Sequence, residues 1–211
     1  MQRRTFLATA LLLLTTAKGQ PPTPRMGAGA HHYEALHDFL QPPPALKFGN
    51  THGIVVTADG RIVLCHTVHK TSESPDAIAI DTCGPRPLLM VGERGDNSRV
   101  QYFSLDGTPR HILKDSVRWP STFDFQNGLL LMPDLKAVVT LYDAKNKPLV
   151  QLGDGRQPDD KTYEGLRTQD RSAFTPGKFV APHAACFDAQ GNILVAEWVE
   201  VGRVTKLRKL G

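Results

Sequence analysis

The sequence has few of the residue patterns that usually reveal a chemical function. It contains only three cysteines among 211 residues, Cys65, Cys83 and Cys186, and none of them forms a CxxC pair. It has no glycine-rich phosphate loop and no nucleophile elbow. Because Cys65 and Cys186 lie in apolar runs, we expect small buried side chains. A disulfide formed after export is the alternative.

The sequence also lacks a strong charge excess. The formal net charge is +4, and Arg3, Arg4 and Lys18 supply three of these positive charges. Without residues 1–19 the net charge falls to about +1, which argues against a nucleic-acid partner. No segment reaches the roughly 20 apolar residues that a membrane-spanning helix needs, so we expect no stable membrane span.

Residues 1–19 have the pattern of an export signal. An arginine pair at 3–4 precedes an apolar run over 6–14, and small residues at 17–19 suit cleavage. The pattern favours a twin-arginine signal, with a Sec signal or an uncleaved anchor as alternatives. We therefore expect a periplasmic or secreted protein that continues with a disordered Pro/Gly/Ala-rich linker at 20–31.

What the sequence does contain is a recurring strand–turn–strand pattern. Short apolar runs alternate with turns built on Asp, Asn and Gly, which tolerate the backbone angles of tight turns. The pattern recurs at 51–65, 77–107, 124–143 and 182–207. A small antiparallel sheet cannot bury both of its faces alone. Several such sheets must pack face to face around an axis, as in an all-β protein of the β-propeller type.

These units resemble NHL repeats. The resemblance rests on Pro182-His183 before a strand, on the turn at 188–192 and on the run at 97–103. More narrowly, the chain is similar to bacterial six-bladed propellers related to peptidyl-α-hydroxyglycine α-amidating lyase. The resemblance implies an NHL-type β-propeller domain at 32–211, with roughly four blade-like units, short or open relative to its six-bladed relatives.

The spacing of the turn glycines is uneven. The interval before Gly84 is too short for a four-stranded blade of roughly 40 residues, so 77–80 must serve two neighbouring units. The interval before Gly191 is too long, and its polar segment at 153–178 predicts an extended surface loop. We expect 32–39 to add the outer strand of the last unit and close the ring. A homo-oligomer, in which a second copy completes the ring, is the alternative.

The resemblance places candidate metal ligands on the propeller axis. In the amidating lyases, a zinc ion in the central channel takes part in releasing glyoxylate from a peptidyl-α-hydroxyglycine. Neutral imidazole suits zinc, and His183 falls on a matching position. His52 and His66 are the further candidate ligands, for zinc or calcium. For each of them the alternative is a histidine that hydrogen-bonds the backbone or lines a wet channel or loop.

Three other residues are candidates for contact with a ligand in the channel. Arg94 lies near a motif position, whereas Glu197 and Trp198 follow the second strand of the last unit. For Trp198 the alternative is packing in the core or at the rim. Arg99 and Arg203 precede third strands, where a blade-to-blade hydrogen bond or ion pair with Asp or Glu is expected, and ligand contact is the alternative.

Three aspartates have a structural interpretation. Asp59, Asp106 and Asp188 occupy turn positions, where a carboxylate accepts hydrogen bonds from nearby backbone amides. We therefore assign them to the fold and not to a binding site.

Two functions follow from this pattern. The first is an exported NHL-type propeller that acts as a binding or scaffold module, with a small molecule, peptide or protein at its channel. The second is a metal-dependent lyase-like enzyme that acts on a peptidyl-α-hydroxyglycine or a related small substrate. The incomplete histidine set favours the first. A defective gene product without a stable fold is the third alternative.

Overall fold

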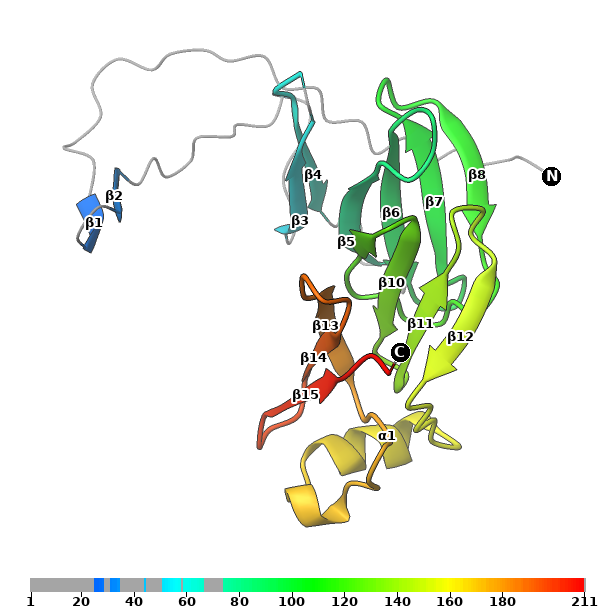
Figure 1. The fold of residues 1–211 in the computed structure, drawn as a ribbon. Helices are drawn as coiled ribbons and strands as arrows, with labels where there is room; N and C mark the ends of the chain where they lie inside the picture. The colour runs from blue at the N-terminus through cyan, green and yellow to red at the C-terminus, as the bar shows by residue number, and fades with distance from the viewer. Residues whose placement is uncertain are drawn as a thin grey trace.

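The protein is built mostly of antiparallel β-sheets that follow one another along the chain (Figure 1). The computed structural model describes residues 25–28, 31–34, 44, 51–57, 59–66 and 74–210. The expected signal at 1–19 lies outside these residues, as does most of the expected linker at 20–31. Within that linker, β1 (Arg25–Ala28) pairs with β2 (His31–Glu34).

Four further sheets have strands in simple sequential order. The first is a hairpin of β3 (Thr51–Val56) and β4 (Ile62–His66). The second contains β5 (Ser74–Asp81), β6 (Leu88–Arg94), β7 (Arg99–Ser104) and β8 (Pro109–Leu113). The third contains β9 (Asp124–Gln126), β10 (Leu129–Asp134), β11 (Val138–Tyr142) and β12 (Pro148–Leu152). The fourth contains β13 (Pro182–Phe187), β14 (Ile193–Glu197) and β15 (Arg203–Leu207).

Successive sheets pack face to face because both faces of the middle strands are apolar. In β10, Met132 packs with Met90 of the second sheet, whereas Leu131 packs with Val195 of the fourth. In β6, Val91 lies in a separate cluster against Val63 of the β3–β4 hairpin. Each fully buried side chain of this size stabilises the fold by roughly 1.5–3 kcal/mol relative to exposure. The sheets therefore stack in chain order.

Two of the sheets repeat the same acid–arginine pair between their second and third strands. Glu93 lies directly opposite Arg99, 2.6 Å from its guanidinium, and Glu197 lies opposite Arg203 and is ion-paired with it. Both arginines therefore pair with an acidic residue, as expected, but each pair lies within one sheet and does not join two blades. Each pair fixes the loop end of its hairpin.

The segment at 153–178 is partly helical instead of a wholly extended loop. Helix α1 (Asp160–Arg167) begins at Asp159, whose carboxylate accepts a 2.7 Å hydrogen bond from the Thr162 amide. A short 3₁₀ helix (Arg171–Ala173) follows. Tyr163 of α1 is buried beside Leu135, Phe174 and Val180. Neither of these described helices is long and apolar enough to cross a membrane.

The expected closure of the last sheet by 32–39 is not observed in the described part of the chain. β2 pairs with β1, and β14 is the one described strand that pairs with β15. β5 likewise forms ladder bonds with β6 alone among the described strands, so 77–80 belong to a single sheet, although β5 packs against β3.

The cysteines depart from expectation at one position. Cys186 was expected to be buried, but its side chain is exposed, because it lies on the face of β13 opposite the buried Ala185. Cys83 is partly exposed, and neither thiol is part of a disulfide. The side chain of Cys65 lies outside the described residues.

The turn aspartates accept local hydrogen bonds, as expected. Hydrogen bonds lower the pKa of Asp188 to about 2. The largest effect comes from the Asn192 side-chain amide, and smaller ones come from Lys206 and from the backbone amides of Asn192 and Gln190. The Ser104 hydroxyl and the Thr108 amide likewise lower the pKa of Asp106 to about 2.

These turns predict a loss of stability in acid. A carboxylate whose pKa is lowered on folding stabilises the protein above its ordinary pKa of 3.8, and that contribution disappears as the pH falls toward 2. We expect the titration of these two carboxylates to leave the melting temperature almost unchanged between pH 8 and 5, and to lower it between about pH 4 and 2. The difference in melting temperature between the wild type and Asp188→Ala should shrink as the pH falls toward 2. A constant difference between the two across this range would contradict the assignment.

Candidate functional site

The three candidate histidines lie at strand ends. His183 is near the start of β13, at a bulge between Pro182 and Ala184, and its side chain is exposed. His52 lies in β3 and His66 ends β4, at the end of the hairpin where Thr51 pairs with His66. The side chains of His52 and His66 lie outside the described residues. Their proposed role as metal ligands therefore stays a prediction.

His183 lies beside an exposed aromatic side chain. The ring of Trp198 meets the imidazole edge-on, with centroids 6.2 Å apart. Trp198 is 52% exposed, and Arg167 from α1 stacks on it with the guanidinium carbon 3.4 Å from the ring centroid. The Arg167 Nε also donates a 3.0 Å hydrogen bond to the Trp198 carbonyl. Helix α1 therefore holds the indole in place while leaving much of its surface open to a ligand.

Arg94 approaches the same imidazole from the end of β6. Its Nε donates to the Pro120 carbonyl at 3.0 Å, and its Nη1 lies 3.3 Å from a carboxylate oxygen of Asp76. The Arg94 side chain is 17% exposed, so these two contacts hold a largely buried guanidinium in one orientation. A guanidinium that is fixed in this way beside an exposed imidazole is suited to bind an anion.

The electrostatics of the site keep the imidazole neutral. Burial lowers the pKa of His183, and the positive charge of Arg94 lowers it further, while Asp76 opposes the change. A neutral imidazole at pH 7 can donate one hydrogen bond and accept another, or bind a metal ion. The site therefore combines one fixed cation, one neutral imidazole and one aromatic surface.

Glu197 serves the fold. It is 8% exposed, and one of its oxygens accepts a 2.7 Å hydrogen bond from the Val180 amide. Arg203 contacts both of its oxygens. Every carboxylate oxygen is thus used to tie β14, β15 and the chain before β13 together, and we do not assign Glu197 to ligand binding.

Sequence reasoning missed the residues that α1 and neighbouring loops add to the site. Lys136 lies 4.0 Å from the Trp119 ring centroid and 4.8 Å from that of Tyr163. The Tyr163 hydroxyl is buried without a hydrogen-bond partner among the described residues. The arginine that stacks on Trp198 could not be found from the sequence, because the polar segment around α1 shows no repeat and no motif.

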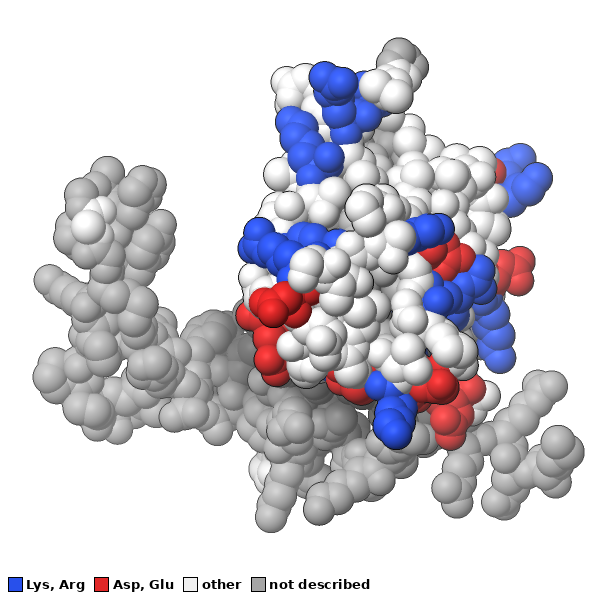
Figure 2. All heavy atoms as spheres, turned by 90° about the horizontal axis from the view of Figure 1, so that it is seen from below, with Lys and Arg blue, Asp and Glu red and all other residues white. Residues whose placement is uncertain are grey.

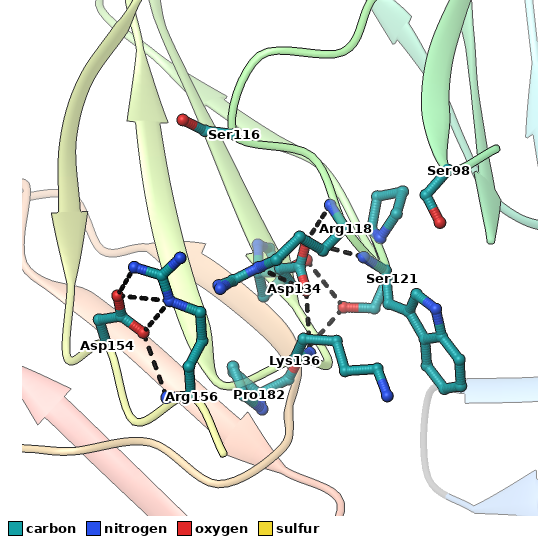
Figure 3. Close-up of polar contacts among 12 residues, drawn as sticks. Ser98, Ser116, Arg118, Ser121, Asp134, Lys136, Asp154, Arg156 and Pro182 are labelled. Carbon is teal, nitrogen blue, oxygen red and sulfur yellow. Dashed lines mark hydrogen bonds and ion pairs between the residues drawn. The ribbon is translucent and has the colours of Figure 1, made fainter. Parts of the chain in front are cut away.

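A second polar centre surrounds Asp134 and is structural (Figure 3). Its side chain is fully buried, and it accepts hydrogen bonds from the backbone amides of Arg118, Trp119 and Lys136 at 2.7, 2.8 and 2.8 Å. Burial raises the pKa of Asp134, whereas these donors and the Arg118 guanidinium oppose the rise. The adjacent Ser121 hydroxyl contacts the Pro133 and Pro182 carbonyls at 3.0 and 3.2 Å, which joins the third and fourth sheets.

A metal site is not complete within the described residues. No three of their His, Cys, Asp and Glu side chains lie close enough together to hold an ion. His183 alone among the expected ligands has a described side chain, so the described donors do not form a zinc or calcium site by themselves.

An apolar groove with a volume of about 460 Å³ lies between the third and fourth sheets. Leu141, Leu152, Phe187 and Leu207 contribute to its walls. Lys178, Arg208 and Lys209 also line it, and all three are exposed. The groove is separate from the His183 site, and sequence reasoning did not identify it.

The underside of the molecule carries charges of both signs. Figure 2 shows Lys and Arg side chains and Asp and Glu side chains spread over this face, with uncharged residues between them. A face of this mixed kind does not favour a polyanionic partner over others.

Comparison with known proteins adds no family to this description. No protein-family model matches the chain, and no curated protein matches it. The class of the protein therefore follows from its own architecture, which is a series of stacked antiparallel sheets with one partly helical connection.

Proposed function

We propose that the protein is an exported binding module of the NHL β-propeller type, and that its ligand is a small carboxylate or the carboxylate end of a peptide. The stacking of sequentially connected sheets in chain order supports the propeller class. The export signal expected at 1–19 supports a periplasmic or secreted location.

The observation that carries the proposal is the fixed cation of Arg94 beside the exposed imidazole of His183. Asp76 and the Pro120 carbonyl fix the orientation of the Arg94 guanidinium, so little side-chain entropy is lost when an anion binds. A carboxylate that contacts this guanidinium gains a charge-assisted hydrogen bond. Trp198 offers an apolar surface near the same imidazole for the rest of the ligand.

Hippurate is a suitable probe because it joins a carboxylate to an aromatic ring. We expect it to bind the wild type, and we expect Arg94→Gln to weaken binding by about tenfold or more, because a hydrogen bond to a charged group contributes about 1.5–3 kcal/mol. Calorimetry or the change in tryptophan fluorescence measures both affinities. Arg110→Gln, which changes an exposed arginine on β8, is the matched control.

The uncharged analogue hippuramide separates charge recognition from apolar contact. It should bind wild type and Arg94→Gln equally weakly. Hippurate binding that is the same in Arg94→Gln as in the wild type would refute the carboxylate proposal.

A metal-dependent lyase is the second candidate, favoured by the neutral imidazole of His183. Its substrate would be a peptidyl-α-hydroxyglycine, and α-hydroxyhippurate is the small analogue, which would give benzamide and glyoxylate. Metal analysis of the purified wild type and His183→Ala tests for a bound zinc or calcium ion. Turnover of α-hydroxyhippurate together with a metal lost in His183→Ala would replace the binding proposal with this one.

A further inference from the structure

The fourth sheet differs from the two before it in its outer edge. The second and third sheets have four strands each, whereas the fourth has three within the described residues. Its outermost strand is β15, which pairs with β14 along one edge. An unpaired strand edge offers a row of backbone donors and acceptors to another extended chain.

The apolar groove begins at this strand. Arg203, Thr205 and Leu207, three alternate residues of β15, face the groove from one side. Leu152 of β12 faces it from the other. Groove and open edge are therefore parts of one surface.

The preceding interface between sheets indicates what belongs in this space. There the outer strand β8 places Leu113 in the core shared by the second and third sheets, where it is 6% exposed. At the groove the corresponding outer strand is β12, whose Leu152 lines one wall, whereas no described strand lies beyond β15 on the other side. The groove walls retain the partly buried Leu141, Leu152, Phe187 and Leu207, which pack at the margin of the core.

Positively charged side chains around the groove indicate which kind of partner it can bind. Lys178, Arg208 and Lys209 are exposed at its lining, and none of them has an ion pair with a described residue. Arg203 also lines it but is already paired with Glu197. A partner segment is thus favoured when it carries acidic side chains.

We propose that an extended acidic peptide segment of a partner protein docks here, pairs with the open edge of β15 and inserts alternate apolar side chains into the groove. Main-chain hydrogen bonds give such a complex its affinity, and the groove gives it selectivity for alternating apolar residues. This site is distinct from the carboxylate site at Arg94.

The test uses the full chain and three fluorescein-labelled heptapeptides. VEVEVEV has alternating apolar and acidic residues, VKVKVKV reverses the charge, and VEVPVEV removes a central backbone donor. We expect VEVEVEV to bind at least about tenfold more tightly than either of the others, because they lose charge complementarity or a ladder hydrogen bond. Hippurate should not displace it, which separates this site from the one proposed above.

Protein variants locate the binding surface. The double change Lys178→Glu and Lys209→Glu affects exposed side chains and should weaken VEVEVEV binding about tenfold without loss of folding. Leu207→Glu should abolish binding by placing a charge at the groove. Leu149→Glu, at a 54% exposed leucine of β12 that does not line the groove, is the matched control and should bind as the wild type does.

Hydrogen exchange distinguishes strand addition from apolar adhesion. Bound VEVEVEV should slow exchange of amides within Val204–Lys206, whereas adhesion to the groove alone would leave them unchanged. Absence of saturable binding up to about 1 mM, equal binding of VEVEVEV and VKVKVKV, or unchanged exchange in β15 would each overturn the proposal.

Discussion

Asp134→Ala is expected to lower the free energy of unfolding by about 3–5 kcal/mol, because three partly buried backbone amides lose their fully buried acceptor at once. Each unsatisfied buried donor costs about 1–3 kcal/mol. The Arg118 guanidinium, whose nitrogens are buried and have no other hydrogen bond to a described residue, also loses its nearest carboxylate. Urea denaturation followed by circular dichroism measures the change.

Two further variants show whether the carboxylate acts through its hydrogen bonds. Asp134→Asn keeps one acceptor oxygen but places an NH₂ donor where backbone amides also donate. We therefore expect it to lower the free energy of unfolding by clearly less than Asp134→Ala does, but by more than zero. Asp96→Ala, at an exposed turn, is the control and should change stability by less than about 0.5 kcal/mol. A loss below about 1 kcal/mol for Asp134→Ala would show that this centre does not hold the sheets together.

Gly155→Ala is expected to destabilise the protein by about 2–4 kcal/mol through steric overlap. A Cβ at this position would lie 2.1 Å from the Phe179 carbonyl oxygen, and this backbone atom cannot move aside without displacing the chain that leads into β13. The Gly155 amide donates to Ala137 at 2.9 Å, and the Phe179 amide donates to Gly153 at 2.8 Å, so both chains are fixed. The melting temperature and the denaturation midpoint should both fall.

The same replacement at another glycine supplies the control. Gly165 lies in α1 with no atom within 4 Å of an added Cβ, so Gly165→Ala should stabilise the protein by up to about 1 kcal/mol through helix propensity. If Gly155→Ala were as stable as the wild type, the close approach of 153–155 to Phe179 would be incorrect.

The strands were predictable because their signals are local. Alternating apolar runs flanked by turns built on Asp, Asn and Gly mark the four units, and the structure confirms antiparallel hairpins at each of them. The ion pairs of Arg99 and Arg203 follow from the same repeat, since each arginine opens a third strand. An alternation of apolar and polar residues identifies a strand locally, so the strands and their turns can be predicted without the tertiary structure.

The helix and much of the site were not predictable in this way. In α1 only Tyr163 is buried, so the segment has too few apolar residues to show a helical period. Asp76 and Arg94 come from the paired strands β5 and β6, whereas Arg167 comes from α1, and only tertiary packing brings these segments toward His183 and Trp198. Glu197 illustrates the opposite error, because its position beside Trp198 suggested a ligand contact, whereas its oxygens bind the backbone and Arg203.

The use of both faces of β6 and β10 has a consequence for how the molecule opens. A sheet that shares a core with a neighbour on each side cannot loosen without breaking two interfaces, whereas the β13–β15 sheet and the β3–β4 hairpin each share a core with one other described sheet. Local opening should therefore reach β10 and β11 later than these two outer sheets. Such a gradient would let the outer sheets adapt their shape while the interior sheets stay rigid.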